Sequence, residues 1–189
     1  KNDLIDCHDR IKPFIHNTPV LTSKLINNLT GADIYFKCEN FQKMGAFKMR
    51  GAANAILKLS DEQKNNGVVT HSSGNHAQAI SLAAKKIGIK AYIIMPSNAP
   101  EIKKIAVRSY GGHLIECEPN LAAREAAAKK IVDLKGATFI HPSNNIDVII
   151  GQGTSCKELI EEYGFFDHIL VPIGGGGLIA GTALAVKYF

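Results

Sequence analysis

The sequence of 189 residues contains no tryptophan and only four cysteines, which lie far apart along the chain. They form no C-x-x-C pair and show no short cysteine–histidine ligand spacing, so we expect neither a zinc site nor a disulfide framework. Scattered thiols favour a reducing compartment, which predicts a cytoplasmic protein. No apolar run approaches the roughly 18 residues that a membrane span needs, and the polar first residues carry no apolar signal region. Membrane insertion and export are therefore not expected.

The excess of basic over acidic residues is also small. The chain has 22 Lys and Arg against 17 Asp and Glu, a formal net charge of +5, and its hydrophobic fraction is 46%. This composition is ordinary for a globular domain with a core, and it excludes disordered and collagen-like classes. The densest basic positions are lysine pairs without aromatic neighbours, so nucleic acid is not an expected partner.

A regular alternation of apolar segments and helical patterns begins near residue 68. Such alternation is typical of parallel βα units and predicts an α/β fold. The predicted strands are 68–71, 91–95, 113–117, 138–140 and 168–173. The predicted helices run from about Asn75 to Gly88, from Pro100 to Gly111, from 121 to 134 with an end at Gly136, and from 154 to 163.

The flanking segments follow a different pattern. A short helix capped by Ser23 is expected to end at Gly31, and residues 34–40 favour a strand. Residues 67–144 are predicted to form a smaller inserted α/β domain. Residues 1–66 and 145–189 then belong to a larger domain that is incomplete, because the final helical pattern stops without a cap or a following strand. We therefore expect the chain to be part of a longer polypeptide that lacks its C-terminal part here.

A run of four glycines, Gly174 to Gly177, stands between a predicted strand and a helical pattern. Glycines allow a tight turn that brings backbone N–H groups together at a helix N-terminus, where the helix dipole favours an anion. The pattern thus indicates a phosphate-binding loop, although a flexible link or a crowded packing corner would also use glycine. It is not a Walker A loop, because no Lys-Ser/Thr follows.

Two further groups could carry chemistry. Residues 72–76, Ser-Ser-Gly-Asn-His, follow a strand at the sheet edge where ligands bind, and they suit a carboxylate, although an ordinary helix cap has the same composition. Lys48 begins an apolar helical stripe that includes Ala52, Ile56 and Leu59. A buried lysine has a lowered pKa and becomes a nucleophile, whereas an ordinary surface lysine would do neither. His71 and His76 are interpreted as polar loop residues, not metal ligands.

A phosphate-binding loop, a carboxylate-binding loop and an amine are what pyridoxal phosphate chemistry on an amino acid requires. Five runs also carry a specific resemblance: TPVLTS (18–23), FKCENFQKMGAFKMRGA (36–52), HSSGNHAQA (71–79), GQGT (151–154) and PIGGGGLIAG (172–181). In this order they resemble the serine/threonine dehydratase and serine racemase family, a tryptophan-synthase-β-like group of pyridoxal phosphate enzymes. The resemblance implies two open parallel-sheet domains with the cofactor in the cleft between them.

The resemblance also implies a role for individual residues. Lys48 matches the lysine that bonds the cofactor as a Schiff base and acts as acid and base on the substrate. Phe47 would lie beside the cofactor ring, and Asn75 would hydrogen-bond the ring oxygen. The phosphate cup is matched by Gly174, Gly175, Gly176 and Gly177. The residues that bind the substrate are matched by Ser72, Ser73, Asn75, His76 and Arg124.

Ser73 is the informative position within this resemblance. Racemase-like members have a second serine there as a proton donor on the face opposite the lysine, whereas threonine dehydratases usually have alanine. Two opposed bases allow racemization, and one allows only elimination. The Gly-Ala-Phe-Lys run (45–48) resembles a branch that includes threo-3-hydroxyaspartate dehydratases. Met44 removes a hydroxyl near the nucleotide site of some animal racemases.

These features predict a pyridoxal phosphate dependent threonine/serine ammonia-lyase or serine racemase that acts on serine, threonine or a related β-hydroxy amino acid. Threo-3-hydroxyaspartate dehydratase is the alternative within the family. An alternative of another class is a non-catalytic subunit that binds a phosphorylated metabolite or pairs with a partner chain. The family suggests a homodimer. Ligands for a divalent cation are expected beyond Phe189.

Overall fold

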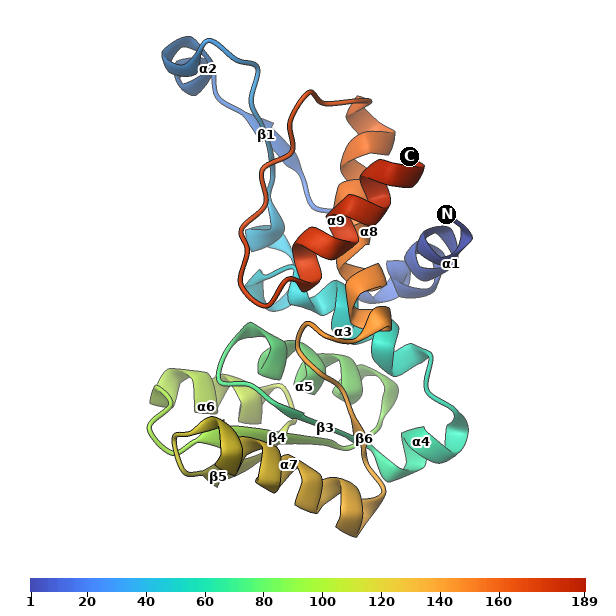
Figure 1. Ribbon diagram of the computed structural model, residues 1–189, viewed down its shortest axis with the longest axis vertical. Coiled ribbons are helices and arrows are strands. Elements are labelled where there is room, and N and C mark those ends of the chain that lie inside the picture. The colour runs from blue at the N-terminus through green and yellow to red at the C-terminus, as the bar shows by residue number, and fades with distance from the viewer.

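The computed structural model describes residues 1–189, which form nine α-helices, six strands and three short 3-10 helices (Figure 1). In chain order these elements are α1 (Asn2–Ile11), η1 (Lys12–Phe14), β1 (Val20–Thr22), α2 (Lys24–Thr30), β2 (Tyr35–Lys37), η2 (Glu39–Phe41), η3 (Lys43–Gly45), α3 (Lys48–Leu57), α4 (Asp61–Asn66), β3 (Val68–His71), α5 (Asn75–Ile87), β4 (Ala91–Pro96), α6 (Glu101–Ser109), β5 (His113–Cys117), α7 (Leu121–Lys135), β6 (Thr138–Phe139), α8 (Ile146–Tyr163) and α9 (Gly177–Tyr188).

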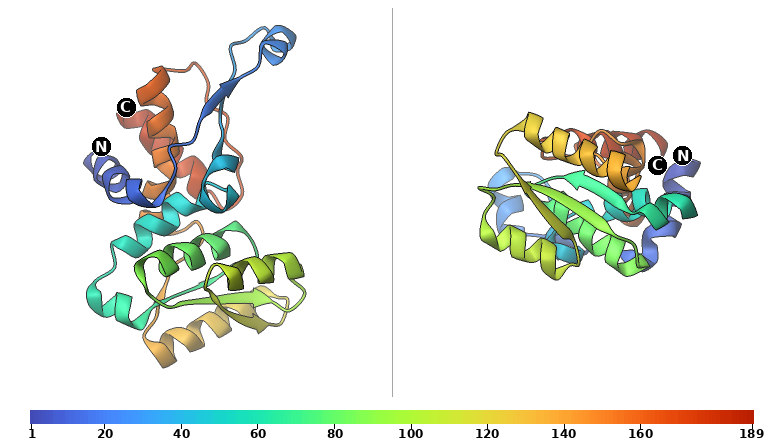
Figure 2. Two further views of the ribbon diagram at one scale, coloured as in Figure 1. Left: turned by 180° about the vertical axis from the view of Figure 1, so that it is seen from behind. Right: turned by 90° about the horizontal axis from the view of Figure 1, so that it is seen from below.

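Four strands form one parallel sheet in the order β5-β4-β3-β6. Helices α5 and α6 cover one face of the sheet and α7 covers the other, as Figure 1 and Figure 2 show. Side chains alternate along each strand. Val68 and Ile93 therefore belong to the main core with α5, whereas Val69 and Ile94 pack in a smaller core with α7.

Most predicted elements are confirmed. Strands form at all four predicted positions between 68 and 140, although β6 ends one residue early. Helices α5 and α7 end where predicted, at Gly88 and Gly136, which adopt the left-handed conformation with φ of 76° and 66°. Glycine adopts this conformation without the steric penalty that a Cβ brings. Ser23 caps α2 as expected, because its side chain accepts a hydrogen bond from the Ile26 N–H group.

The strand predicted at 168–173 does not form. The segment is extended, but no strand of this chain lies beside it to exchange backbone hydrogen bonds. Two of its apolar side chains are largely exposed, Leu170 to 95% and Ile173 to 72%. Hydrophobic pattern alone indicated the strand, and the pattern cannot supply the neighbour that a strand requires.

Helix α8 begins at Ile146, eight residues before the predicted start at 154. Gly151 and Gly153 in its first half count against a helix on propensity alone. In the structure they allow close packing: a Cβ on Gly151 would lie 2.7 Å from the Arg50 carbonyl oxygen on α3, and one on Gly153 would lie 2.6 Å from the Gly181 carbonyl oxygen on α9. Tertiary packing therefore outweighs propensity here.

Outside the sheet, the chain forms a helical layer and a small antiparallel pair. Helix α3 packs between α5 and α8, and α8 also contacts α1 and α9 (Figure 1). Helix α1, which the sequence analysis did not predict, buries Leu4, Cys7 and Ile11 against this layer. Strands β1 and β2 pair in antiparallel register, with Val20 opposite Lys37.

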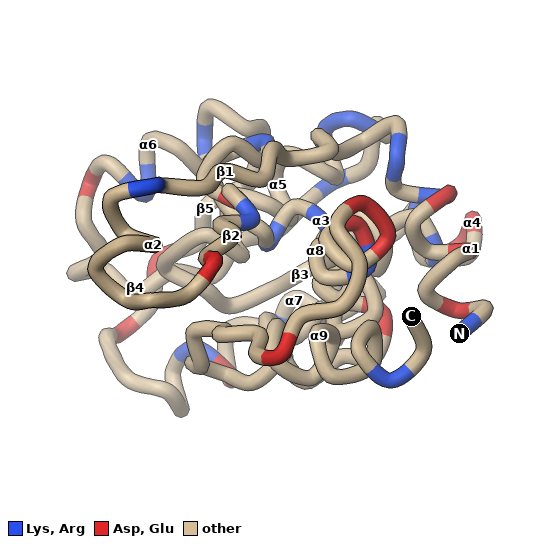
Figure 3. The backbone as a smooth tube through the Cα atoms, turned by 90° about the horizontal axis from the view of Figure 1, so that it is seen from above, with Lys and Arg blue, Asp and Glu red and all other residues tan.

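The surface charge is dispersed. Figure 3 shows Lys and Arg residues on many elements, interspersed with Asp and Glu. None of the helices combines the length and the hydropathy that crossing a lipid bilayer requires.

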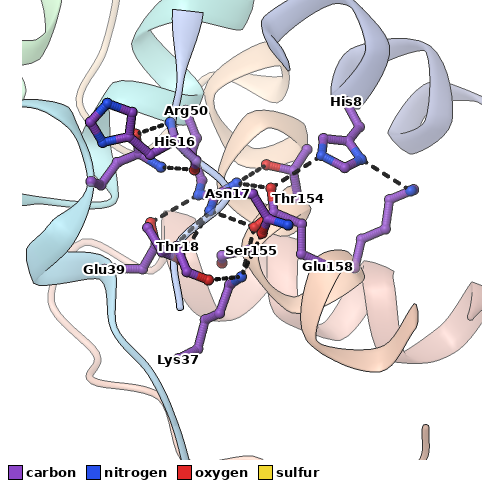
Figure 4. A network of polar contacts seen from close by, with 12 residues as sticks. His8, His16, Asn17, Thr18, Lys37, Glu39, Arg50, Thr154, Ser155 and Glu158 are labelled. Atoms are coloured by element: carbon purple, nitrogen blue, oxygen red, sulfur yellow. Dashed lines mark hydrogen bonds and ion pairs between the residues drawn. The ribbon is translucent and has the colours of Figure 1, made fainter. Parts of the chain in front are cut away.

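A network of buried charges ties α3 to α8 and to the chain around β2 (Figure 4). The side chain of Arg50 on α3 is fully buried, and its guanidinium makes paired hydrogen bonds to Glu158, at 2.7 and 2.8 Å, and to Glu39, both at 2.8 Å. A fifth hydrogen bond, to the Thr154 hydroxyl, satisfies the last guanidinium donor. Lys37 lies 2.8 Å from Glu158, so two cations balance two anions.

These contacts set the charge state of Glu158. Burial alone would raise the pKa of this carboxyl, but hydrogen bonds from His8 and Arg50 lower its pKa to about 2. The carboxylate therefore stays ionised at neutral and mildly acidic pH. Breaking such a pair is costly, because it leaves an uncompensated charge in the interior.

We predict that Glu158→Gln lowers the free energy of unfolding at neutral pH by about 3 kcal/mol, the value that the pKa difference between the folded and unfolded states implies. Because the folded-state pKa is depressed, the contribution is complete above pH 4.5 and disappears as the pH falls toward 2. Urea unfolding of the full-length protein across this pH range measures it. Glu162→Gln, an exposed change on the same helix, should leave the wild-type pH dependence in place. Equal stability of the two variants would contradict the prediction.

Candidate active site

Lys48 is the first residue of α3 and is half-buried. Its Nζ donates a hydrogen bond of 2.7 Å to the Pro142 carbonyl oxygen, and it lies 5.3 Å from the centre of the Phe47 ring. Burial lowers the pKa of Lys48. A larger fraction of the neutral amine is therefore present at a given pH, and the neutral amine is the form that attacks a carbonyl carbon.

The glycine loop leads into the N-terminus of α9, which begins at Gly177. Gly176 has a φ of 85°, a conformation that favours glycine. The backbone N–H groups of residues 174–179 donate to no acceptor in the chain. Unpartnered N–H groups at a helix N-terminus, together with the helix dipole, form a site for an anion.

Ser143 packs against this loop. A Cβ on Gly175 would lie 2.8 Å from the Ser143 Cβ, and one on Gly177 would lie 3.1 Å from the Ser143 Cα. At Gly174 and Gly176 a Cβ would meet nothing within 4 Å. One side of the loop is thus held against Ser143, and the other is open.

The loop from Ser72 to Asn75 follows β3 at the carboxyl edge of the sheet. The Ser72 N–H group continues the sheet by bonding the Ile94 carbonyl, and the Ser72 hydroxyl accepts the Gly74 N–H group. No side chain caps α5, whose first residue is Asn75. The ordinary helix cap therefore does not explain this sequence, and the first N–H groups of α5 stay available. Ser72 and Ser73 are half-buried and Asn75 is exposed.

His76 and His71 do not lie in a loop, contrary to the interpretation from sequence. His71 ends β3, and His76 lies in the first turn of α5 with 2% of its surface exposed. Burial, with a smaller effect from the nearby charge of Lys48, lowers the pKa of His76 to about 3, so its ring is neutral. Its Nδ1 has no hydrogen-bond partner, and its Nε2 lies 3.4 Å from the Ile140 carbonyl oxygen. Only the backbone N–H of His76 can reach a ligand at the helix start.

Arg124 lies on α7, across the sheet from α3 and α5. Its Nε bonds the Asn120 carbonyl oxygen within the same helix, and no contact joins it to Lys48 or to the glycine loop. Its charge is near enough to act on His71, whose pKa is lowered first by burial and then by His141 and Arg124. Arg124 therefore lies at the same sheet edge as the other candidates but apart from them.

The segment 140–144, which the sequence analysis did not single out, is where the candidates meet. Pro142 accepts the hydrogen bond of Lys48, Ser143 contacts the glycine loop, and the Ile140 carbonyl lies beside His76. Its position in the sequence could have indicated it. The segment follows β6 at the carboxyl edge of a parallel sheet, where ligands bind in such folds.

The donor set fits pyridoxal phosphate. Free N–H groups suit its phosphate, a lysine with a lowered pKa suits its aldehyde, and the open side of the glycine loop leaves room beside them. Fold and site together define an α/β protein with the parts of a site for a phosphorylated aldehyde.

The sequence pattern of the family described as "Pyridoxal-phosphate dependent enzyme" matches residues 11–188. The chain belongs to this family. It is 51% identical over 98% of its length to the beta-hydroxyaspartate dehydratase of Paracoccus denitrificans. Among solved structures it is similar to the serine racemase of Dictyostelium discoideum (TM-score 0.95, 48% identity, 98% of the chain) and to a T.th. threonine deaminase (TM-score 0.92, 40% identity, 98% of the chain). These comparisons confirm the predicted family, its fold class and its cofactor.

The chain spans only 59% of the Paracoccus relative, 61% of the Dictyostelium structure and 60% of the threonine deaminase structure.

We predict that Gly175→Ala destabilises the protein by about 1 to 3 kcal/mol, because the added Cβ would overlap Ser143. Gly174→Ala is the matched control and should cost little, since its Cβ would meet open space. Urea unfolding of the full-length protein without cofactor compares the two. Ser143→Gly in the Gly175→Ala background should restore part of the loss. Equal losses of stability in Gly175→Ala and Gly174→Ala would contradict the prediction.

Proposed function

We propose that the protein is a pyridoxal phosphate dependent serine racemase or serine/threonine ammonia-lyase. The observation that carries the proposal is the convergence of three parts on residues 140–144: the Lys48 amine, the glycine loop and the start of α5. The similarity to a serine racemase and to a threonine deaminase supports it.

In this proposal each part of the cofactor has its own protein partner. The N–H groups of Gly174 to Gly177 would hold the phosphate, and the Lys48 amine would hold the cofactor at its aldehyde carbon. Phe47 would lie beside the ring, and the exposed amide of Asn75 would donate to the ring oxygen. When bound, the cofactor withdraws electrons from the substrate's Cα and so makes its proton acidic.

The chain's own groups then bind the substrate and move the proton. The Ser72 hydroxyl and the N–H groups of Asn75 and His76 bind the substrate carboxylate, and Arg124 supports it from the sheet edge. Lys48 Nζ takes the α-proton on one face. The Ser73 hydroxyl lies on the other face and can return a proton, which inverts the centre. If the β-hydroxyl instead leaves as water, the product is an enamine, which a water molecule hydrolyses to a 2-oxo acid and ammonia.

A second candidate is dehydration of threo-3-hydroxyaspartate. It is favoured by the 51% identity to the Paracoccus beta-hydroxyaspartate dehydratase and by a yeast L-threo-3-hydroxyaspartate ammonia-lyase at 50%. Both candidates begin with the same loss of the α-proton. Threo-3-hydroxyaspartate has a second carboxylate that serine and threonine lack. Comparison of kcat/KM for the three substrates therefore separates the two candidate functions.

The proposal also covers the cellular location, the oligomeric state and the domain organisation of the protein. Four free thiols support a cytoplasmic location, and the family resemblance suggests a homodimer. We also propose that 67–144 is an inserted domain between 1–66 and 145–189, with the cofactor in the cleft.

We predict that the full-length protein shows the visible absorbance band of lysine-bound pyridoxal phosphate and that Lys48→Ala abolishes it. The reason is that Lys48 supplies the half-buried amine beside the glycine loop. Lys90→Ala, at an exposed position, is the control and should keep the band. Anion binding without such a band in the wild type would instead support a non-catalytic subunit for a phosphorylated metabolite.

We predict that Ser73→Ala reduces racemization of serine by at least about 100-fold, the lower range for a lost general acid, and leaves elimination largely intact. Chiral chromatography measures the first reaction and 2-oxo acid release the second. Ser72→Ala should instead weaken substrate binding in both reactions alike. An equal loss of both reactions in Ser73→Ala would remove the assignment of Ser73 as the second proton donor.

A further inference from the structure

The His141 ring organises the turn that follows β6. Its Nδ1 accepts two backbone hydrogen bonds, from the Ser143 N–H group at 3.1 Å and from the Asn144 N–H group at 2.8 Å. Both partners are donors, so Nδ1 carries the lone pair and the ring proton is on Nε2. Asp and Asn oxygens bond following N–H groups in the same way in Asx turns.

These two bonds are the hydrogen bonds that hold the backbone N–H groups of the segment. Among residues 141–145 no other backbone N–H group donates a hydrogen bond, and Pro142 has no N–H group. The backbone ladder of β6 ends with the bond from the Ile140 N–H group to the Val69 carbonyl. Without the His141 acceptor, little in the local backbone would fix the path of the chain.

The imidazole is itself held in place by neighbouring rings. Its centre lies 6.2 Å from that of Phe139 and 6.0 Å from that of His71, both in edge-on geometry. Phe139 ends β6 and His71 ends β3, so the sheet sets the direction in which Nδ1 points.

The residues that this turn fixes are those that touch the candidate active site. Pro142 supplies the carbonyl that accepts from Lys48, and Ser143 packs against Gly175 and Gly177. His141 makes neither contact itself. His141 can therefore affect the candidate active site only by shaping the turn.

We propose that His141 is a positioning residue whose Nδ1 lone pair shapes the 141–144 turn and thereby places the Lys48 amine and the glycine loop for the cofactor. The inference rests on the proposed cofactor site and adds to it a residue that the site does not contain. His141 acts as a hydrogen-bond acceptor through Nδ1 and takes no part in proton transfer.

The test compares His141→Leu with His141→Asn in the full-length protein. Leucine keeps the bulk and removes the acceptor, whereas the Asn oxygen can accept both N–H groups as in an Asx turn. We expect the affinity for pyridoxal phosphate, titrated without substrate, to fall about tenfold in His141→Leu and to stay within about twofold of the wild type in His141→Asn. His113→Asn, at an exposed position at the start of β5, is the control and should bind as the wild type does.

Rescue by Asn is the result that a merely space-filling role would not produce. The proposal is overturned if Asn binds as weakly as Leu, or if Leu binds as tightly as the wild type. Should His141→Leu fail to fold, His141→Gln, whose amide lies one methylene farther out, replaces it and is expected to bind weakly.

Failure of the proposed cofactor site is recognised separately, because the wild type would then show no affinity for pyridoxal phosphate. In that case inorganic phosphate is titrated against the same variants. The same order of affinities supports the positioning role for the glycine loop, and equal affinities overturn it.

Discussion

The hydrogen bonds of the buried Arg50 guanidinium hold together the part of the structure that contains Lys48. The guanidinium joins α3 to Glu39, just after β2, and to Glu158 on α8, and all its donors are satisfied. Lys48 lies two residues earlier on α3, so the same anchor fixes the start of the helix that presents the amine. A buried ion pair adds less to stability than its geometry suggests, but it strongly penalises any arrangement that separates the partners. It thereby specifies one packing of α3 on α8.

In three buried or half-buried basic residues, the neighbouring groups decide how the pKa changes. Burial alone would lower the pKa of each. Arg50 has two carboxylates beside it, which raise its pKa further above the usual value. Lys48 has only a neutral carbonyl, so its pKa falls. His76 has Lys48 nearby and is held neutral. A permanent cation and an amine with a lowered pKa thus lie two residues apart on one helix.

The carboxyl edge of the sheet brings the remaining parts together. Parallel strands all end at one edge, so the chain leaves β3 and β6 side by side. The loop after β3 leads to α5, and the turn after β6 meets both Lys48 and the glycine loop. The 140–144 segment is short, and the His141 ring replaces the backbone hydrogen bonds that it lacks. The candidate active site is therefore assembled where secondary structure ends.

Features that depend on local pattern could be predicted from the sequence. Alternation and helix ends predicted the sheet strands, α5 and α7, and residue type with spacing indicated Lys48, residues 72–76 and the glycine run as candidate site residues. Features that depend on a distant partner appear only in the folded chain. The segment 168–173 has no neighbouring strand, α8 begins early because its glycines face other helices, and Arg50 and His141 matter through contacts with residues far away or through a turn. A local pattern records the preference of a segment, whereas burial and pairing are properties of two segments, and only folding brings the second one into contact.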